Sequence, residues 1–134
     1  MTNSRRKGAS GEREFSAAVL DTMGVRLVRQ LEQCRAGGFD LAPERDSDSV
    51  GARRLRQFAI EVKRHRTATA GDIDAWWTQA IRQADDTGLD ALLAYRSDRQ
   101  PWRVVIGLHL IVCGTAPHTV TLTLDAFAAI TPTT

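Results

Sequence analysis

One segment limits the folds open to this chain more than any other, because its pattern is that of a strand, a helix and a second strand. Residues 58–64, FAIEVKR, alternate in side-chain character with the period of a β-strand. Apolar side chains recur at helical spacing over residues 71–86, and residues 90–96, DALLAYR, form another apolar run. A helix that crosses between two strands predicts a right-handed β–α–β unit whose strands are parallel.

The segments on either side predict further elements of a single domain, residues 1–134. They are, in chain order, a helix at residues 10–24, strands at 25–31 and 36–42, a polar loop or long hairpin tip at 43–57, a strand at 102–108, and a strand followed by a short helix at 118–130. Ser10 is the expected N-cap of the first helix, and Gly24 is its expected C-cap. This order predicts an α/β fold with a mixed central β-sheet flanked by helices.

Positive charge is concentrated in the first half of the chain. Residues 1–66 hold 14 lysines and arginines against 9 acidic residues, whereas residues 67–134 hold 4 against 7. The basic residues cluster in RRK at 5–7, RRLR at 53–56 and KRHR at 63–66. Such clusters indicate a polyanion as partner, with solvated surface loops as the alternative.

Cysteine usage and hydropathy exclude other classes of protein. Cys34 and Cys113 lie far apart and match no metal or redox spacing, which is typical of thiols in a reducing cytoplasm. No apolar run approaches the roughly 20 residues that a membrane span needs. The start, MTNSRRKGASGERE, has no apolar stretch behind its basic residues and is no secretory signal. We therefore expect a cytoplasmic protein that does not bind a membrane.

The strand at 58–64 carries opposite charges on one of its two faces. Phe58, Ile60 and Val62 alternate with Ala59, Glu61 and Lys63. A carboxylate on a central strand is costly to desolvate unless it is paired, open to a cleft or bound to a metal. A simple ion pair between Glu61 and Lys63 at a sheet edge is the alternative explanation.

Three observations favour a functional site over such an ion pair. The chain has sixteen arginines and two lysines, so Lys63 stands where arginine is the usual cation, and its compact ammonium suits a position beside a reacting water or phosphate. Asp40 follows GGF and can lie beside Glu61 if the strands that carry them pair. Glu12 falls near the middle of the apolar face of the first predicted helix.

These acids predict a divalent metal site. Carboxylate oxygens suit Mg²⁺, with Mn²⁺ as a frequent substitute. Asp40 and Glu61 would hold the ion, the main-chain carbonyl of Val62 and waters would complete its shell, and Glu12 would support that shell or bind a second ion. A bound metal lowers the pKa of a water, and Lys63 would orient that water or neutralise charge on the phosphate.

Three segments together resemble the PD-(D/E)xK nuclease superfamily, and within it the Holliday-junction-resolvase-like endonucleases of archaeal and phage type. They are, in chain order, RRKGASGERE, GGFDL and IEVKR. The resemblance covers about residues 5–95 and implies a restriction-endonuclease-like core. It places the metal-binding aspartate on Asp40, the ExK pair on Glu61 and Lys63, and the glutamate of the opening on Glu12. The sequence departs from the pattern at the proline before Asp40, where it has phenylalanine, and in its long segment between Asp40 and Glu61.

The resemblance also implies a substrate and an assembly. The expected protein is a Mg²⁺-dependent endonuclease that hydrolyses phosphodiester bonds of DNA in a bacterial or phage-infected cell, with Holliday junction resolution in recombination as one such activity. A glutamine on the following helix matches Gln79, with Gln83 one turn later. The residues expected to contact the DNA backbone are Gln79, Arg6, Lys7, Arg64 and Arg66. A homodimer is expected, held by the late strands or by a tryptophan.

Two other functions remain open from the sequence. One is a nucleic-acid-binding module of the same fold without catalysis, and the other is an interaction domain in which the Glu61–Lys63 pair is structural. Glu14 is expected in solvent, away from Glu12. The adjacent Trp76 and Trp77, whose rings diverge by ~100°, are expected to pack mainly in the core, and contact with a dimer partner or stacking on a base is the alternative for one of them. His65, His109 and His118 are expected to be structural, and contact with phosphate is the alternative for His65, which lies within the basic run.

Overall fold

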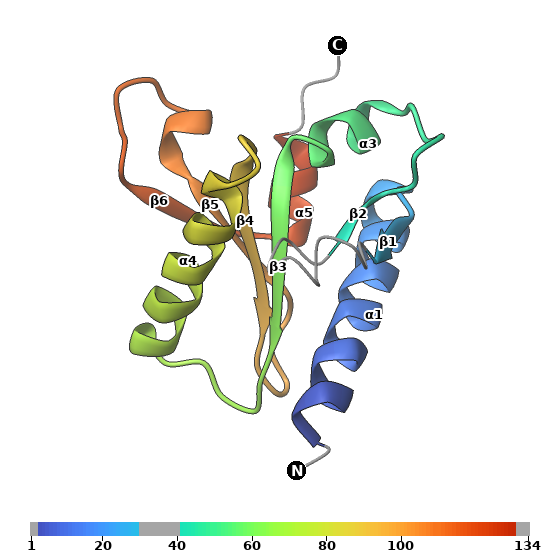
Figure 1. Ribbon diagram of the computed structural model, residues 1–134, viewed down its shortest axis with the longest axis vertical. Coiled ribbons are helices and arrows are strands. Elements are labelled where there is room, and N and C mark those ends of the chain that lie inside the picture. Colours follow the sequence, from blue (N-terminus) through green and yellow to red (C-terminus); the bar gives the residue numbers. More distant parts are fainter. Residues whose placement is uncertain (1–2, 30–40, 131–134) are drawn as a thin grey trace.

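The computed structural model of the chain describes residues 3–29 and 41–130, and among them the side chains from residue 10 onward. Its elements are α1 (Asn3–Met23), β1 (Leu27–Arg29), β2 (Leu41–Pro43), α3 (Val50–Leu55), β3 (Phe58–Arg64), α4 (Ala70–Asp85), β4 (Asp90–Arg96), β5 (Arg103–Gly107), the short 3₁₀ helix η1 (Leu108–Leu110), β6 (Thr119–Thr123) and α5 (Leu124–Ala129) (Figure 1).

The strands of the described part form one six-stranded sheet in the order β1-β2-β3-β4-β5-β6. β3 and β4 are parallel, with Phe58 opposite Asp90 and Lys63 opposite Tyr95. The other neighbouring pairs are antiparallel. Because α4 joins β3 to β4, the predicted β–α–β unit and the predicted mixed sheet are confirmed.

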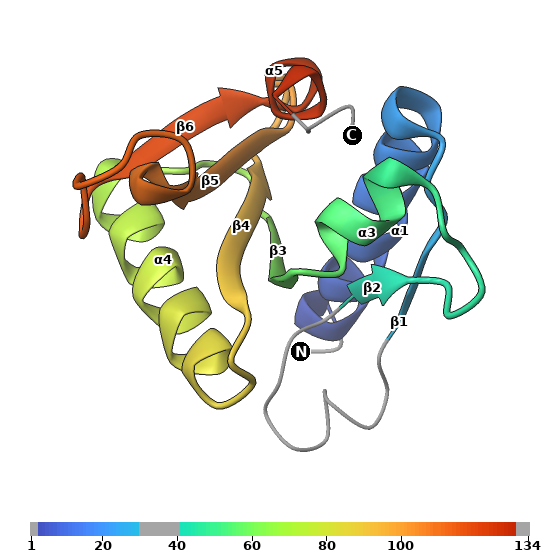
Figure 2. The same ribbon diagram turned by 90° about the horizontal axis from the view of Figure 1, so that it is seen from above.

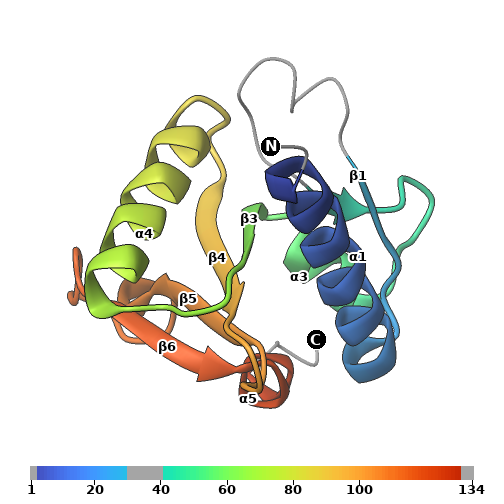
Figure 3. The ribbon, with the colours of Figure 1, turned by 90° about the horizontal axis from the view of Figure 1, so that it is seen from below.

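Helices cover both faces of this sheet, with α1, α3 and α5 on one side and α4 on the other (Figure 2 and Figure 3). The larger core lies on the α1 side. There Phe15 of α1 packs against Trp102 with ring centroids 5.1 Å apart, and Phe58 of β3 packs edge-on against Phe127 of α5 at 5.9 Å. A smaller apolar cluster joins α4 to β4 and β5 on the opposite face.

Local sequence explains where the helices end. The Thr69 hydroxyl accepts a hydrogen bond from the backbone N–H of Asp72, and the Asp72 carboxylate accepts one from the backbone N–H of Thr69, a capping box that begins α4. Gly24 follows α1 with φ at 69°, and its N–H donates to the carbonyl of Leu20 at 3.0 Å. The predicted C-cap at Gly24 is therefore confirmed.

Two predictions differ from the structure. Ser10 is no N-cap, because α1 begins at Asn3 and continues through it. The segment 43–57, predicted as a polar loop, contains α3, whose N-cap is Ser49. A six-residue helix is too short to reveal itself by periodicity and depends on tertiary packing. Of the strand predicted at 36–42, residues 36–40 lie outside the described part of the chain.

Candidate active site

The charged pair of β3 lies on the face that α4 covers, opposite the larger core. Glu61 is only 4% exposed and is the buried charged residue of the described part of the chain. The Nζ atom of Lys63 lies 3.3 Å from Oε1 of Glu61, and the Lys63 side chain is 21% exposed. Alternation along β3 produces this arrangement, because Phe58, Ile60 and Val62 fill the core on the α1 side.

Helix α4 adds an amide to this pair. Nε2 of Gln79 donates a long hydrogen bond of 3.5 Å to Oε1 of Glu61. One carboxylate oxygen therefore has both an ammonium and an amide within reach, from two different elements. A buried carboxylate is tolerated when such partners compensate the loss of water. The position predicted for Gln79 beside the acid–lysine pair agrees with this geometry.

Glu12 of α1 points toward β1. Its carboxylate forms an ion pair with Nε of Arg29 at 3.2 Å, and its side chain is 14% exposed. Asp40 lies outside the described residues. Across 3–29 and 41–130, no three His, Cys, Asp or Glu side chains form a group that could hold a metal ion. The grouping of Glu12, Asp40 and Glu61 thus stays a prediction.

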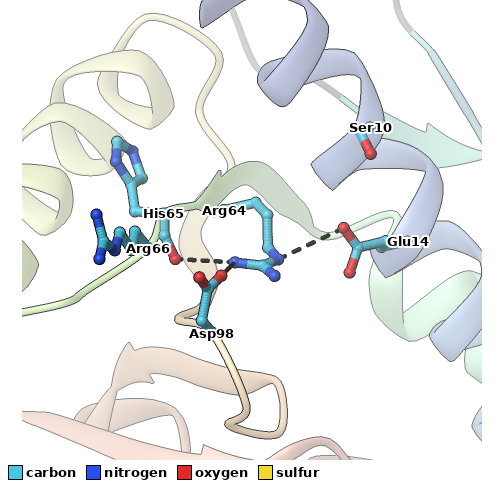
Figure 4. A pocket seen from close by; sticks show the side chains of 6 residues that line it. All are labelled: Ser10, Glu14, Arg64, His65, Arg66 and Asp98. Carbon is cyan, nitrogen blue, oxygen red and sulfur yellow. Dashed lines mark hydrogen bonds and ion pairs between the residues drawn. The ribbon is translucent and has the colours of Figure 1, made fainter. Parts of the chain in front are cut away.

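Arg64 follows Lys63 but points to the opposite face, toward α1. Its Nε lies 3.4 Å from Glu14, and its Nη1 donates to Oδ1 of Asp98 at 2.8 Å (Figure 4). The hydrogen bond to Asp98 raises the pKa of Arg64, so this guanidinium stays charged. Arg96 pairs with the same Glu14. The expectation that Glu14 is solvated was wrong, because α1 and the sheet bring it between two arginines.

A pocket of about 250 Å³ opens beside this network. Its lining residues are Ser10, Glu14, Arg64, His65, Arg66 and Asp98. In Figure 4, Arg64 lies between Glu14 and Asp98, whereas Arg66 and the imidazole of His65 lie on the other side of the strand end. Arg66 is exposed, so its guanidinium stands at the edge of the pocket in contact with solvent. For Arg6 and Lys7 the structure places only the backbone, in α1.

The imidazole of His65 stacks on the indole of Trp76 from α4. The ring centroids are 4.7 Å apart and the planes meet at 27°. Tyr95 of β4 lies 6.1 Å from the same indole. The sequence reasoning treated His65 as structural. Two signals could have singled it out: it continues the alternation of Glu61 and Lys63, and Trp76 precedes Gln79 by about one helical turn.

A mixed sheet with helices on both faces and an acid–x–lysine pair on a central strand define the class of the chain, a restriction-endonuclease-like nuclease fold. The family described as "Phage putative PDDEXK endonuclease" matches residues 3–131. The chain belongs to this family of phage endonucleases, and the resemblance found in its sequence is confirmed.

A solved structure shows the same fold. Hjc of Archaeoglobus fulgidus, a Holliday junction resolvase from an archaeal hyperthermophile, superposes with a TM-score of 0.51 at 16% sequence identity. The superposition covers 92% of this chain and 96% of that one. No curated protein sequence matches this chain. Within the described residues, no helix has both the length and the apolar character to cross a membrane.

Proposed function

We propose that the chain is a metal-dependent DNA endonuclease that hydrolyses phosphodiester bonds at the Glu61–Lys63 pair. The observation that carries the proposal is a carboxylate 4% exposed on a central strand, 3.3 Å from one of the two lysines of the chain. Membership of a phage endonuclease family supports the reaction class. The name of the archaeal relative supports branched DNA, including Holliday junctions, as substrate.

The donor atoms near Glu61 suit a hard divalent cation. Glu61 offers a carboxylate and Val62 a main-chain carbonyl, and Asp40, which directly precedes β2 in the sequence, would supply a second carboxylate. Glu12 would support the shell from α1. Oxygen ligands of this kind favour Mg²⁺, with Mn²⁺ as substitute. The ion, when bound, would make a water more acidic and neutralise charge on a phosphate oxygen.

The protein's own side chains have separate tasks in this proposal. Lys63 holds a positive charge beside the Glu61 carboxylate, where it can orient the attacking water or stabilise charge that develops on the phosphate. Gln79 donates to Oε1 of Glu61 and so limits the rotation of the carboxylate. Both groups come from elements packed on the sheet, which holds their geometry.

Basic residues at one end of the molecule would bind the DNA backbone. The start of α1, which carries Arg6 and Lys7, and the connection from β3 to α4, which carries Arg66, lie at the same end (Figure 1). We assign the phosphate contact to Arg66, which is exposed. Arg64 is committed to Glu14 and Asp98, so its main role is to hold α1 against β3. Contacts of this kind position DNA without reading its sequence.

If the substrate is a symmetric four-way junction, two strands are cut by two sites, and a homodimer would supply them. Residues 104–124 contain no lysine, arginine, aspartate or glutamate. Ile111 and Val112 in this segment are 44% and 49% exposed. Depletion of charge around exposed apolar side chains is typical of an interface between proteins and unsuited to a DNA contact. We place the partner copy on this surface.

The test is cleavage of a supercoiled plasmid and of a synthetic four-way junction during a titration with Mg²⁺. Lys63→Ala and Asp40→Asn should each lower the rate by about 100-fold or more while DNA binding is retained. Asp46→Asn, at an exposed aspartate between β2 and α3, is the matched control. Calorimetry with Mn²⁺ in the absence of DNA should show binding that Glu61→Gln weakens.

Two results would overturn the proposal. Unchanged cleavage by Lys63→Ala or Asp40→Asn would refute the assigned roles. DNA binding that weakens with salt, with neither cleavage nor metal binding, would identify a catalytically inactive binding module of the same fold.

A further inference from the structure

The α4-facing side of β3 continues beyond Lys63. The backbone N–H of His65 donates to the carbonyl of Arg96 at 3.1 Å, which extends the pairing with β4 one residue past the end of β3. Alternation therefore places Glu61, Lys63 and His65 in one row on the same side of the strand. His65 lies two residues from Lys63, about 6.6 Å along the strand.

Helix α4 faces this row with matched side chains. Gln79 meets Glu61, and about one turn earlier Trp76 meets His65 with ring planes inclined by 27°. Tyr95, opposite Lys63 in the register of β4, lies 6.1 Å from the indole of Trp76. An aromatic surface thus begins beside the acid–lysine pair and extends to the end of the strand.

Core packing explains only part of this surface. Trp76 and Tyr95 are half-buried against the apolar cluster under α4, as expected for core residues. His65 is exposed, and Arg66 next to it is exposed as well. The imidazole of His65 lies over the indole of Trp76 at the open end of the site, beside the exposed Arg66. Aromatic rings next to basic side chains are typical of surfaces on which nucleic-acid bases stack.

We propose that the His65–Trp76 stack receives an unpaired nucleobase next to the scissile phosphate. This inference rests on the proposed nuclease function and adds a substrate class to it. In a continuous duplex each base is stacked between its neighbours and offers no free face. A branch point, a flap or a single-stranded segment can present a base with one face free. The enzyme therefore prefers DNA with an unstacked base over duplex of the same sequence.

The test compares the binding of two DNAs in EDTA, so that cleavage plays no part. One is a duplex, and the other has the same sequence with one 2-aminopurine left unpaired. His65→Ala should weaken binding of the unpaired DNA about tenfold, change duplex binding by no more than about twofold, and lose the fluorescence change of the 2-aminopurine. His65→Tyr, which keeps a planar ring, should restore both. Binding is also measured for Trp76→Ala, with Ile73→Ala, another half-buried residue of the apolar cluster under α4, as the matched control.

Equal losses on the two DNAs, or no loss on either, would overturn the stacking site. Thermal melting separates a fold defect from a binding defect, and because His65 is exposed its variants decide the matter even if Trp76→Ala does not fold. If the wild type cleaves DNA through Lys63 while the His65 variants leave the preference unchanged, only the stacking site is refuted. If the wild type neither binds nor cleaves DNA, the nuclease proposal is refuted as well.

Discussion

At the scale of single residues, the basic run after Glu61 contains side chains with different surroundings. Lys63 and His65 face α4, whereas Arg64 faces α1 and is held between Glu14 and Asp98. Arg66 follows the strand and is exposed. Under the proposed function and the proposed stacking site, these four successive residues would serve catalysis, anchoring of a helix, base stacking and phosphate contact.

Arg64→Ala should lower the stability of the fold, whereas Arg66→Ala should weaken DNA binding. Loss of the Arg64 guanidinium removes the 2.8 Å charged hydrogen bond to the exposed Asp98 and the ion pair with Glu14, and it should lower the free energy of unfolding by about 1 kcal/mol, because solvent screens such pairs. Arg66→Ala should leave stability within about 0.5 kcal/mol. It should weaken DNA binding and reduce the slope of log affinity against log salt by about 1. Urea denaturation and a salt series of DNA titrations measure the two effects, and an exchange of these outcomes would contradict the assignment.

At the scale of elements, the contact between α1 and β3 depends on one glycine. A Cβ atom at Gly11 would lie 2.6 Å from Cβ of Arg64, which is too close for any real contact. The absence of a side chain lets α1 approach the end of β3, where Glu14 then reaches Arg64. Glu12 is the next residue of α1, so this close approach also sets the position of that acid over the sheet.

Gly11→Ala should therefore destabilise the protein. Overpacking costs about 1–3 kcal/mol, more than the roughly 1 kcal/mol that alanine gains over glycine within a helix. Gly71→Ala in α4 is the matched control, because its Cβ would meet nothing closer than the Thr69 hydroxyl at 3.9 Å. That variant should be neutral or slightly stabilising in chemical denaturation. Stabilisation by both substitutions would show that α1 does not depend on this approach.

The capping box of α4 predicts a dependence of stability on pH. The hydrogen bond from the Thr69 backbone lowers the pKa of Asp72 below its ordinary value. A carboxyl whose pKa is lower in the folded state stabilises the fold above its unfolded pKa of about 4, and this contribution is lost as the pH falls through the folded value. Asp72→Asn should thus be less stable than the wild type at pH 7 and approach it below about pH 4.

Thermal melting between pH 2 and pH 7 measures the difference. Asp74→Asn makes the same change of charge in the same helix without a capping hydrogen bond, so it should differ little from the wild type at either end of the range. A deficit of Asp72→Asn that persisted at pH 2 would show that the carboxylate is not what begins the helix.

At the scale of the whole molecule, the basic and apolar surfaces are separate. The basic clusters belong to α1, α3 and the end of β3, whereas the segment between β5 and β6 has no formal charge apart from its histidines. A groove of about 290 Å³ lies between this segment and α4, and Trp77 and Ile81 contribute to its wall. Under the proposed function, DNA binds at one surface and the second copy at the other.

Val112→Asp should convert the proposed dimer to a monomer. A charge in an apolar interface is costly to bury, whereas the exposed side chain of Val112 tolerates it in the monomer. Light scattering should show half the mass of the wild type with a similar melting temperature, and junction cleavage should fall. Leu20→Asp is the control, because it also replaces an exposed apolar side chain with a carboxylate but lies in α1, away from the proposed interface. A monomeric wild type would refute the dimer.

Local pattern in the sequence determined the elements of the central unit. Strict alternation over residues 58–64 and helical spacing over 71–86 specified a strand, a helix and the face on which Glu61 and Lys63 lie, because backbone geometry alone sets these periods. The fold class followed from the order of these elements.

Contacts between distant residues depended on the tertiary structure. Arg64 meets Asp98 across 34 positions, and Arg96 meets Glu14 across 82. The periodicity of a strand or helix relates only residues that are close in the sequence, so it cannot predict such a pairing. For the same reason, the sequence pattern predicted that Glu14 lies in solvent and did not relate His65 to Trp76. The sequence determined which side chains share a strand face, because the period of the backbone sets it. The tertiary structure decided which of them meet, because only packing brings segments that are distant in the sequence into contact.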